Sequence, residues 1–139
     1  MTKGEEKIFN ILSENGVSFK REVSFSGLCG FKNVPLRYDF GIYDFFGNIK
    51  FLIEYDGEGH FQQIDKFNKN KKDYLHRLEL DRRKNRYALS HNITLIRIPY
   101  WDYEKINFSS IFNTPEYIVK NIFHNDIINP NNKGGGGNG

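Results

Sequence analysis

Two acidic residues, Asp39 and Glu54, interrupt segments whose apolar pattern is typical of β-strands. Strands disfavour Asp, and a carboxylate beside an apolar core is costly unless it is paired or binds a metal ion. If the two segments are antiparallel neighbours, their carboxylates can reach one divalent cation. Hard cations such as Mg²⁺ take oxygen ligands and often only one or two from the protein. We therefore expect Asp39 and Glu54 to hold a metal ion; the alternative is an ordinary ion pair of Asp39 with Arg37 or Lys50.

A charged turn follows the second of these segments. Gly57 and Gly59 favour a tight turn that presents Asp56, Glu58 and His60. The imidazole of His60 could act as a general base, orient a water molecule or contact a phosphate. The alternative is that His60 is an ordinary polar loop residue.

Basic residues concentrate in one segment of a chain whose net charge is only +3. Residues 66–86 contain nine lysines and arginines against three acidic residues, a net charge of +6. Such a segment attracts the phosphates of nucleic acids; the alternative is a solvated helix whose long side chains cover apolar surface. The candidate nucleic-acid-binding residues are Lys69, Lys71, Lys72, Arg77, Arg82 and Arg83.

The elements that must position these groups follow from apolar periodicity and turn residues. Residues 49–98 read as strand, long helix, strand, which predicts a parallel, right-handed crossover, whereas the earlier strands form antiparallel hairpins. We expect an α/β fold with a mixed four-stranded sheet flanked by helices, in one domain over residues 1–128. Residues 129–139 form an Asn/Gly-rich tail that we expect to be disordered. The predicted elements are a helix at 3–15 opened by a Thr2–Glu5 capping box, strands at 17–25, 36–45 and 49–55, a helix at 71–90, a strand at 93–98 and a helix at 115–124.

Composition excludes several classes of protein. The 139 residues suit about one domain, and the single cysteine, Cys29, cannot form an internal disulfide or a thiolate zinc site. No apolar run approaches the roughly 20 residues of a membrane helix, and residues 1–6 lack a signal-peptide pattern. We expect an intracellular protein, in the cytoplasm of a bacterial or virus-infected host cell, that does not contact a membrane.

Several motifs in order resemble one known family. The pattern Phe-Leu-Ile-Glu-Tyr-Asp-Gly-x-x-His at 51–60, after Leu-Arg-Tyr-Asp-Phe at 36–40, resembles the PD-(D/E)XK nuclease superfamily. Within it, the chain is most similar to the branch of very-short-patch repair endonucleases and related phage or homing-type nucleases. The resemblance covers residues 2–101, and its other parts are Thr2-Lys3-Gly4-Glu5, Asp81-Arg82-Arg83-Lys84 followed by Tyr87, and Leu95 to Trp101.

This resemblance implies a restriction-endonuclease-like fold and a site for Mg²⁺ or Mn²⁺. Asp39 and Glu54 fall on the metal-binding positions, Glu5 on the active-site Glu of the first helix, and His60 on the downstream His of this branch. Asp56 would reach the metal directly or through water.

The chain departs from the family pattern at its lysine. The Glu-x-Lys motif would place Lys at the position of Asp56, so Lys84 on the long helix is the candidate replacement. Asp81 is a further candidate acidic ligand, and Tyr87 belongs to the same helix signature. The structural zinc site of the very-short-patch enzymes requires more cysteines than this chain has, which argues against mismatch-repair specificity.

The resemblance and the residues together predict a metal-dependent DNA endonuclease. The alternative is a catalytically impaired nuclease fold that binds DNA or protein, and a related possibility is an RNA or structure-selective nuclease. The position of Lys84 discriminates, because a Lys84 far from Asp39 and Glu54 would favour the binding module. A small domain would obtain specificity from loops, from a homodimer or from a partner protein.

Overall fold

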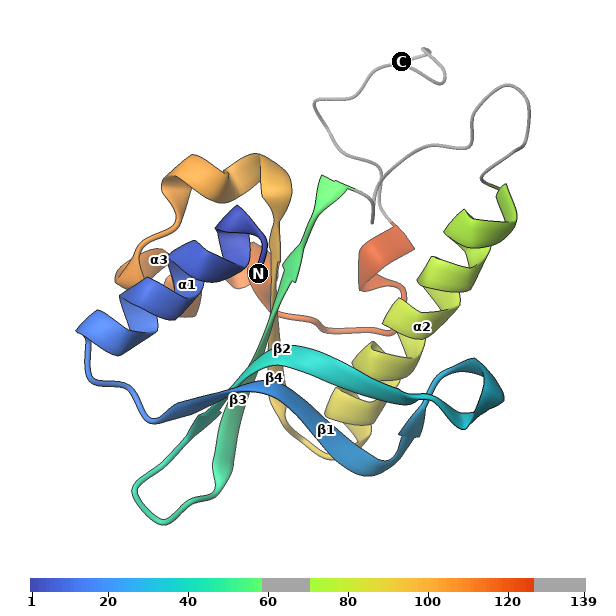
Figure 1. Ribbon diagram of the computed structural model, residues 1–139, viewed down its shortest axis with the longest axis horizontal. Coiled ribbons are helices and arrows are strands. Elements are labelled where there is room, and N and C mark those ends of the chain that lie inside the picture. The colour runs from blue at the N-terminus through green and yellow to red at the C-terminus, as the bar shows by residue number, and fades with distance from the viewer. Residues whose placement is uncertain (59–70, 127–139) are drawn as a thin grey trace.

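A four-stranded mixed sheet forms the centre of the computed structural model, which describes residues 1–58 and 71–126. Figure 1 shows α1 and α3 on one side of this twisted sheet and α2 on the other. The helices and strands are α1 (Lys3–Glu14), β1 (Phe19–Cys29), β2 (Pro35–Tyr43), β3 (Ile49–Asp56), α2 (Lys71–Ser90), β4 (Thr94–Pro99) and α3 (Phe108–Asn113), joined in part by short 3-10 turns.

The strand order β1-β2-β3-β4 confirms the predicted sheet. β1 and β2 are antiparallel, as are β2 and β3, whereas β3 and β4 are parallel and joined through α2. The predicted parallel pairing across the helix is therefore confirmed, and α2 begins and ends at the predicted residues. β1 continues to Cys29, beyond the predicted end at residue 25.

Apolar side chains form two cores, one on each face of the sheet. On the α1 face, Ile8 and Leu12 of the helix pack with Ile53 of β3. On the α2 face, Leu52 packs with Ala88 and Leu95. Successive residues of β3 alternate between these faces, as a pleated strand requires, so Glu54 lies on the α2 face together with Leu52.

β2 changes face at Asp39. Phe40 and Ile42 belong to the α1 core, whereas Leu36 and Tyr38 belong to the α2 core, although all four positions have the same parity. A regular strand would put them on one side. The change of face therefore gives Asp39 an irregular position in the middle of the sheet.

The N-terminus of α1 is held close to β3. Thr2 and Glu5 form the predicted capping box. Gly4 is buried, and a Cβ atom on it would lie 2.1 Å from the ring of Tyr55. Glycine thus allows the first turn of α1 to approach the strand that carries Glu54.

The predicted helix at 115–124 is wrong. Pro115–Tyr117 form a 3-10 turn, after which the chain is extended: Ile118 bridges Ile96, and the Val119 N–H donates to the Leu95 carbonyl. The sheet edge at β4 therefore takes this segment as an extended chain. The helix in this region is the short α3, whose start is fixed by an Asn107–Ser110 capping box.

Candidate active site

Asp39 and Glu54 meet where β2 and β3 separate. The pairing of these strands ends at Phe40 and Ile53. Beyond it, the Glu54 Oε2 accepts the Asp39 backbone N–H at 2.9 Å, and the Asp39 Oδ2 accepts the Tyr55 backbone N–H at 2.7 Å. Each carboxylate thus replaces a ladder hydrogen bond of the opposite strand. This reciprocal arrangement fixes both side chains at the opening between the strands.

Lys84 reaches this pair from α2. Its Nζ donates to Glu54 Oε1 at 3.2 Å and to Oε2 at 3.1 Å, and the two side chains are only 14% and 4% exposed. The Tyr38 hydroxyl donates to the Lys84 carbonyl at 2.8 Å, and the Tyr38 ring lies 5.6 Å from the Lys84 ammonium. The helix and the ammonium group are thus both fixed against the sheet.

The carboxyl group of Asp39 is electrostatically unusual. Burial, followed by the charge of Glu54, raises its pKa to about 8, while the Tyr55 N–H and the Lys84 ammonium act in the opposite direction. Within the described residues, Arg37 pairs with Glu22 rather than with Asp39. The alternative of an ordinary Asp39–Arg37 ion pair is therefore not what the structure shows.

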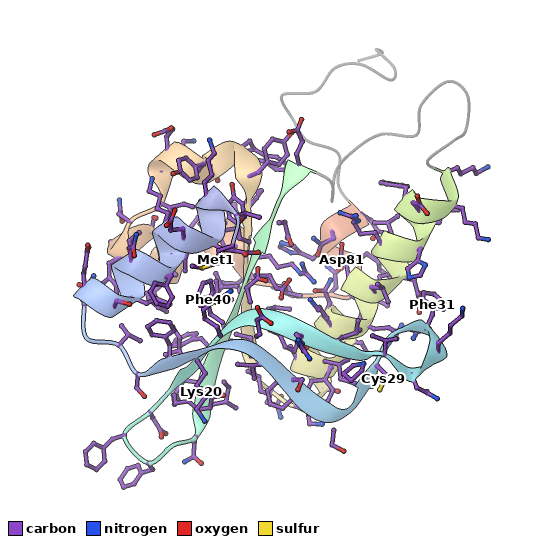
Figure 2. The ribbon with its side chains drawn as sticks, viewed as in Figure 1. Met1, Lys20, Cys29, Phe31, Phe40 and Asp81 are labelled. Atoms are coloured by element: carbon purple, nitrogen blue, oxygen red, sulfur yellow. The ribbon has the colours of Figure 1, made fainter. Side chains whose placement is uncertain are left out.

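Glu5 lies beside the same carboxylate. Its charge is among the causes of the raised pKa of Asp39. A pocket of about 180 Å³ is lined by Glu5, Asp39 and Phe40, together with charged residues of β1 and β2. In Figure 2, Phe40 lies between α1 and the sheet. Glu5 therefore serves both as a helix cap and as a wall of this pocket.

Four of the five predicted catalytic residues are thus near one another: Glu5, Asp39, Glu54 and Lys84. His60 lies outside the described residues, as does Lys69. Across residues 1–58 and 71–126, no three Asp, Glu, His or Cys side chains gather closely enough to enclose a metal ion by themselves. Among these residues, a metal ion would find one or two carboxylates, a number that is common for Mg²⁺.

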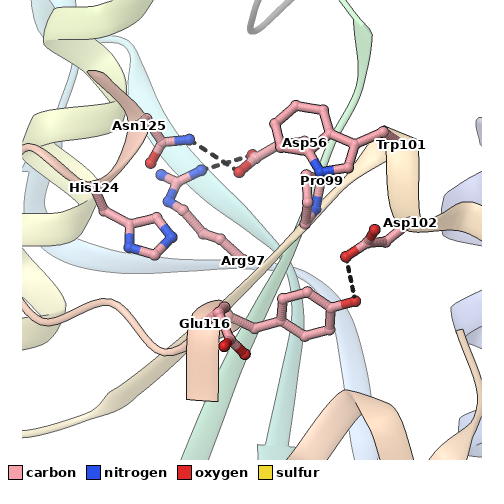
Figure 3. Close-up of a pocket in the computed structure, with 9 residues that line it drawn as sticks. Asp56, Arg97, Pro99, Trp101, Asp102, Glu116, His124 and Asn125 are labelled. Atoms are coloured by element: carbon pink, nitrogen blue, oxygen red, sulfur yellow. Dashed lines mark hydrogen bonds and ion pairs between the residues drawn. The ribbon is translucent and has the colours of Figure 1, made fainter. Parts of the chain in front are cut away.

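Asp56 belongs to a different network, built around Arg97 (Figure 3). The Arg97 Nη1 donates to Asp56 Oδ1 at 2.7 Å, and the Asn125 amide donates to Asp56 Oδ2 at 2.9 Å. Asp81 also lies on this network, its Oδ1 3.6 Å from Arg97. Arg97, Asp56 and Asp81 are 1%, 2% and 3% exposed. Because a buried arginine requires buried acceptors, we assign Asp56 and Asp81 to the support of Arg97 and leave them out of the metal site.

The basic candidates of α2 divide into two groups. Lys71, Lys72 and Arg77 are exposed. Arg82 pairs with Asp126, and Arg83 pairs with Glu79 while it also donates to the Cys29 carbonyl. The first group is available to a ligand, whereas the second helps to fix α2 to its neighbours.

Tyr87 is packed into the structure rather than placed at the site. Its ring stacks on Phe25 at 5.2 Å and on His91 at 3.8 Å. It therefore supports the contact between α2 and β1.

Sequence reasoning missed Arg97, Arg21 and Arg37. Arg97 had a signal, since a charged residue between Ile96 and Ile98 in a strand requires a buried partner. Arg37 was considered only as an ion-pair partner of Asp39, and Arg21 had no signal, because only the pairing of β1 with β2 brings it to the pocket beside Asp39.

No helix among the described residues is long and apolar enough to cross a membrane. No model of a known protein family matches the chain. No solved structure matches it either. One stretch of 52 residues is 36% identical to "Uncharacterized protein 307L" of Invertebrate iridescent virus 6. That stretch is 37% of this chain and 26% of the viral protein, so the chain spans about a quarter of the length of the relative it matches.

Proposed function

We propose that the protein is a metal-dependent endonuclease that hydrolyses phosphodiester bonds of DNA at Asp39, Glu54 and Lys84. The observation that carries the proposal is the meeting of two strand carboxylates with a helix lysine at the opening between β2 and β3. The resemblance to PD-(D/E)XK nucleases assigns roles to these same residues.

The donor groups suit Mg²⁺ or Mn²⁺. Both carboxylates supply hard oxygen ligands. The pKa of Asp39 is raised first by burial and then by the charge of Glu54, so the negative charges at this site are incompletely neutralised. A divalent cation would relieve that repulsion. When bound, such an ion would supply a water of lowered pKa and would polarise a phosphate oxygen.

The remaining groups act through charge and position. Lys84 holds a positive charge 3.1 Å from Glu54, so it can donate a hydrogen bond to a phosphate oxygen as negative charge develops there. Glu5 borders the same pocket and can accept a hydrogen bond from a water molecule beside Asp39. The Tyr55 N–H keeps the Asp39 side chain oriented throughout.

The position of Lys84 also bears on the alternative function. The enzyme requires a lysine beside the acidic residues, and the contact of Lys84 with Glu54 at 3.1 Å meets this requirement. The exposed cations Lys71, Lys72 and Arg77 offer a sequence-independent attraction for DNA phosphates. Sequence specificity would then require a second copy of the chain or a partner protein.

The test is cleavage of supercoiled plasmid and of single-stranded DNA with Mg²⁺, Mn²⁺ or EDTA. Asp39→Asn and Glu54→Gln keep an oxygen that can accept the existing hydrogen bonds while they remove a charge. Glu79→Gln on the surface of α2 is the matched control. We expect metal-dependent nicking or linearisation that falls at least about 100-fold in the two site variants and is unchanged in the control.

Two results would contradict the proposal. Cleavage unchanged in both site variants would place the active site elsewhere. A folded wild-type protein that binds DNA but never cuts it would favour the alternative of a binding module.

A further inference from the structure

Glu22 occupies a strained position directly opposite Asp39. The register pairs Arg21 with Phe40 and Val23 with Tyr38, so Glu22 faces Asp39 across β1 and β2. Its backbone φ angle is +54°, in the left-handed region that residues other than glycine and asparagine rarely adopt. Backbone strain of this kind is often found at functional sites.

The Glu22 carboxylate lies between two arginines. Its Oε2 is 3.3 Å from the Arg21 Nη2, and its Oε1 is 3.4 Å from the Arg37 Nη1. The two guanidinium groups therefore converge on one small anion. Arg21 lies on β1 and Arg37 on the adjacent β2, so the pairing of the two strands fixes the distance between their backbones.

All three residues line the pocket that also contains Asp39 and Glu5. This pocket of about 180 Å³ is large enough for a phosphate group. A polyanion that approaches Asp39 also comes close to the carboxylates of Glu5 and Glu54. Cations in the same pocket are needed to offset that repulsion, and Arg21 and Arg37 are the cations that line it.

We infer that Arg21 and Arg37 bind a backbone phosphate of the DNA strand that lies beside Asp39, and that Glu22 occupies the place of this phosphate in the free protein. The inference rests on the proposed function, of which it names the substrate contact. Guanidinium groups match carboxylate and phosphate with the same planar donor geometry, which makes the exchange chemically simple. The three side chains are 37%, 54% and 61% exposed for Arg21, Glu22 and Arg37, so their mutual ion pairs contribute little and can be broken by a stronger ligand.

The test is the binding of a short duplex, measured by fluorescence anisotropy in EDTA at several salt concentrations. In the Arg21→Ala/Arg37→Ala variant we expect at least about tenfold weaker binding and a salt slope smaller by about 0.9, the value for one lost phosphate contact. Glu22→Gln removes the competing charge and should bind a few times more tightly than wild type. Lys105→Ala is the control, because it removes an exposed, ion-paired cation from outside the pocket.

A conservative pair of variants guards against loss of structure. Arg21→Lys and Arg37→Lys keep the charge but lose the planar donor pair, so they should weaken binding less than alanine does. Wild-type affinity and salt slope in the double alanine variant, or weaker binding in Glu22→Gln, would overturn the inference.

Cleavage separates this inference from the proposed function. If wild type cuts DNA with Mg²⁺ while the double alanine variant binds and cuts as well as wild type, the inference fails and the nuclease proposal stands. If wild type never cuts but the alanine variant loses the predicted binding, the phosphate site stands and the nuclease proposal fails.

Discussion

Replacement of Asp56 by asparagine tests whether this residue supports the fold or binds a metal ion. In the structure its carboxylate lies 2.7 Å from Arg97, and the two side chains are 2% and 1% exposed. Asparagine keeps the size but removes the charge, which leaves the Arg97 guanidinium buried with a weaker partner. Asp81, 3.6 Å from the same guanidinium, compensates only in part.

The expected magnitude follows from the burial of the pair. Removal of one partner from a buried ion pair costs about 3–5 kcal/mol, and we expect a value of about 3 kcal/mol because Asp81 remains. The Arg83–Glu79 pair has nearly the same length, 2.8 Å, but is 30% and 37% exposed. Glu79→Gln should therefore cost only about 0.3–0.5 kcal/mol.

The assay is urea unfolding followed by circular dichroism in EDTA. For a slope of about 1–3 kcal/mol per molar urea, the midpoint should fall by about 1–3 M in Asp56→Asn and by less than about 0.5 M in Glu79→Gln. Equal midpoints for the two variants would refute the assignment of Asp56 to a buried pair. A loss of stability in Asp56→Asn that occurs only with Mg²⁺ present would return this residue to the metal site.

Two further predictions concern the approach of α1 and the titration of Asp39. Gly4→Ala should lower the free energy of unfolding by about 1–3 kcal/mol and slow DNA cleavage, because the added Cβ would collide with the Tyr55 ring. Gly57→Ala is the control, because it has open space around it and should change neither stability nor cleavage. The folded-state pKa of Asp39, about 8, lies above its ordinary value of 3.8, so the folded protein binds this proton more tightly than the unfolded chain does. In EDTA the urea midpoint of wild type should therefore fall between pH 5 and pH 8 relative to that of Asp39→Asn, and a constant difference would contradict the raised pKa.

The central sheet could be predicted because its signals are local. The apolar runs of β3 and β4, separated by one long helix, leave a right-handed parallel crossover as the usual solution. Asp39 and Glu54 could likewise be predicted as candidate site residues, because a carboxylate within an apolar strand is costly unless it is paired or binds a metal ion. The structure brings these two residues together with Lys84, although the sequence could only suggest it as a replacement.

The sequence was least informative where tertiary contacts decide the conformation of a segment or the partner of a side chain. Sequence spacing does not show which acid of a strand faces a cation on a neighbouring strand, so the contact of Asp56, a predicted metal ligand, with Arg97 could not be foreseen. The residues Thr114-Pro115-Glu116 are typical of a helix start, but the segment that follows is extended and pairs with the edge strand β4 through Ile118. The approach of Arg21 and Arg37 to one pocket depends on the register of β1 and β2, and strand register has no local pattern in the sequence.

Binding of Mn²⁺, measured by the loss of the electron paramagnetic resonance signal of the free ion, tests the central claim most directly. It requires no knowledge of the DNA sequence that the protein cuts. Wild type and Glu79→Gln should bind Mn²⁺ alike, and Asp39→Asn and Glu54→Gln should bind it at least about tenfold more weakly. Equal Mn²⁺ affinity in all four proteins, or none in wild type, would contradict the assignment of Asp39 and Glu54 as the ligands of a catalytic metal ion.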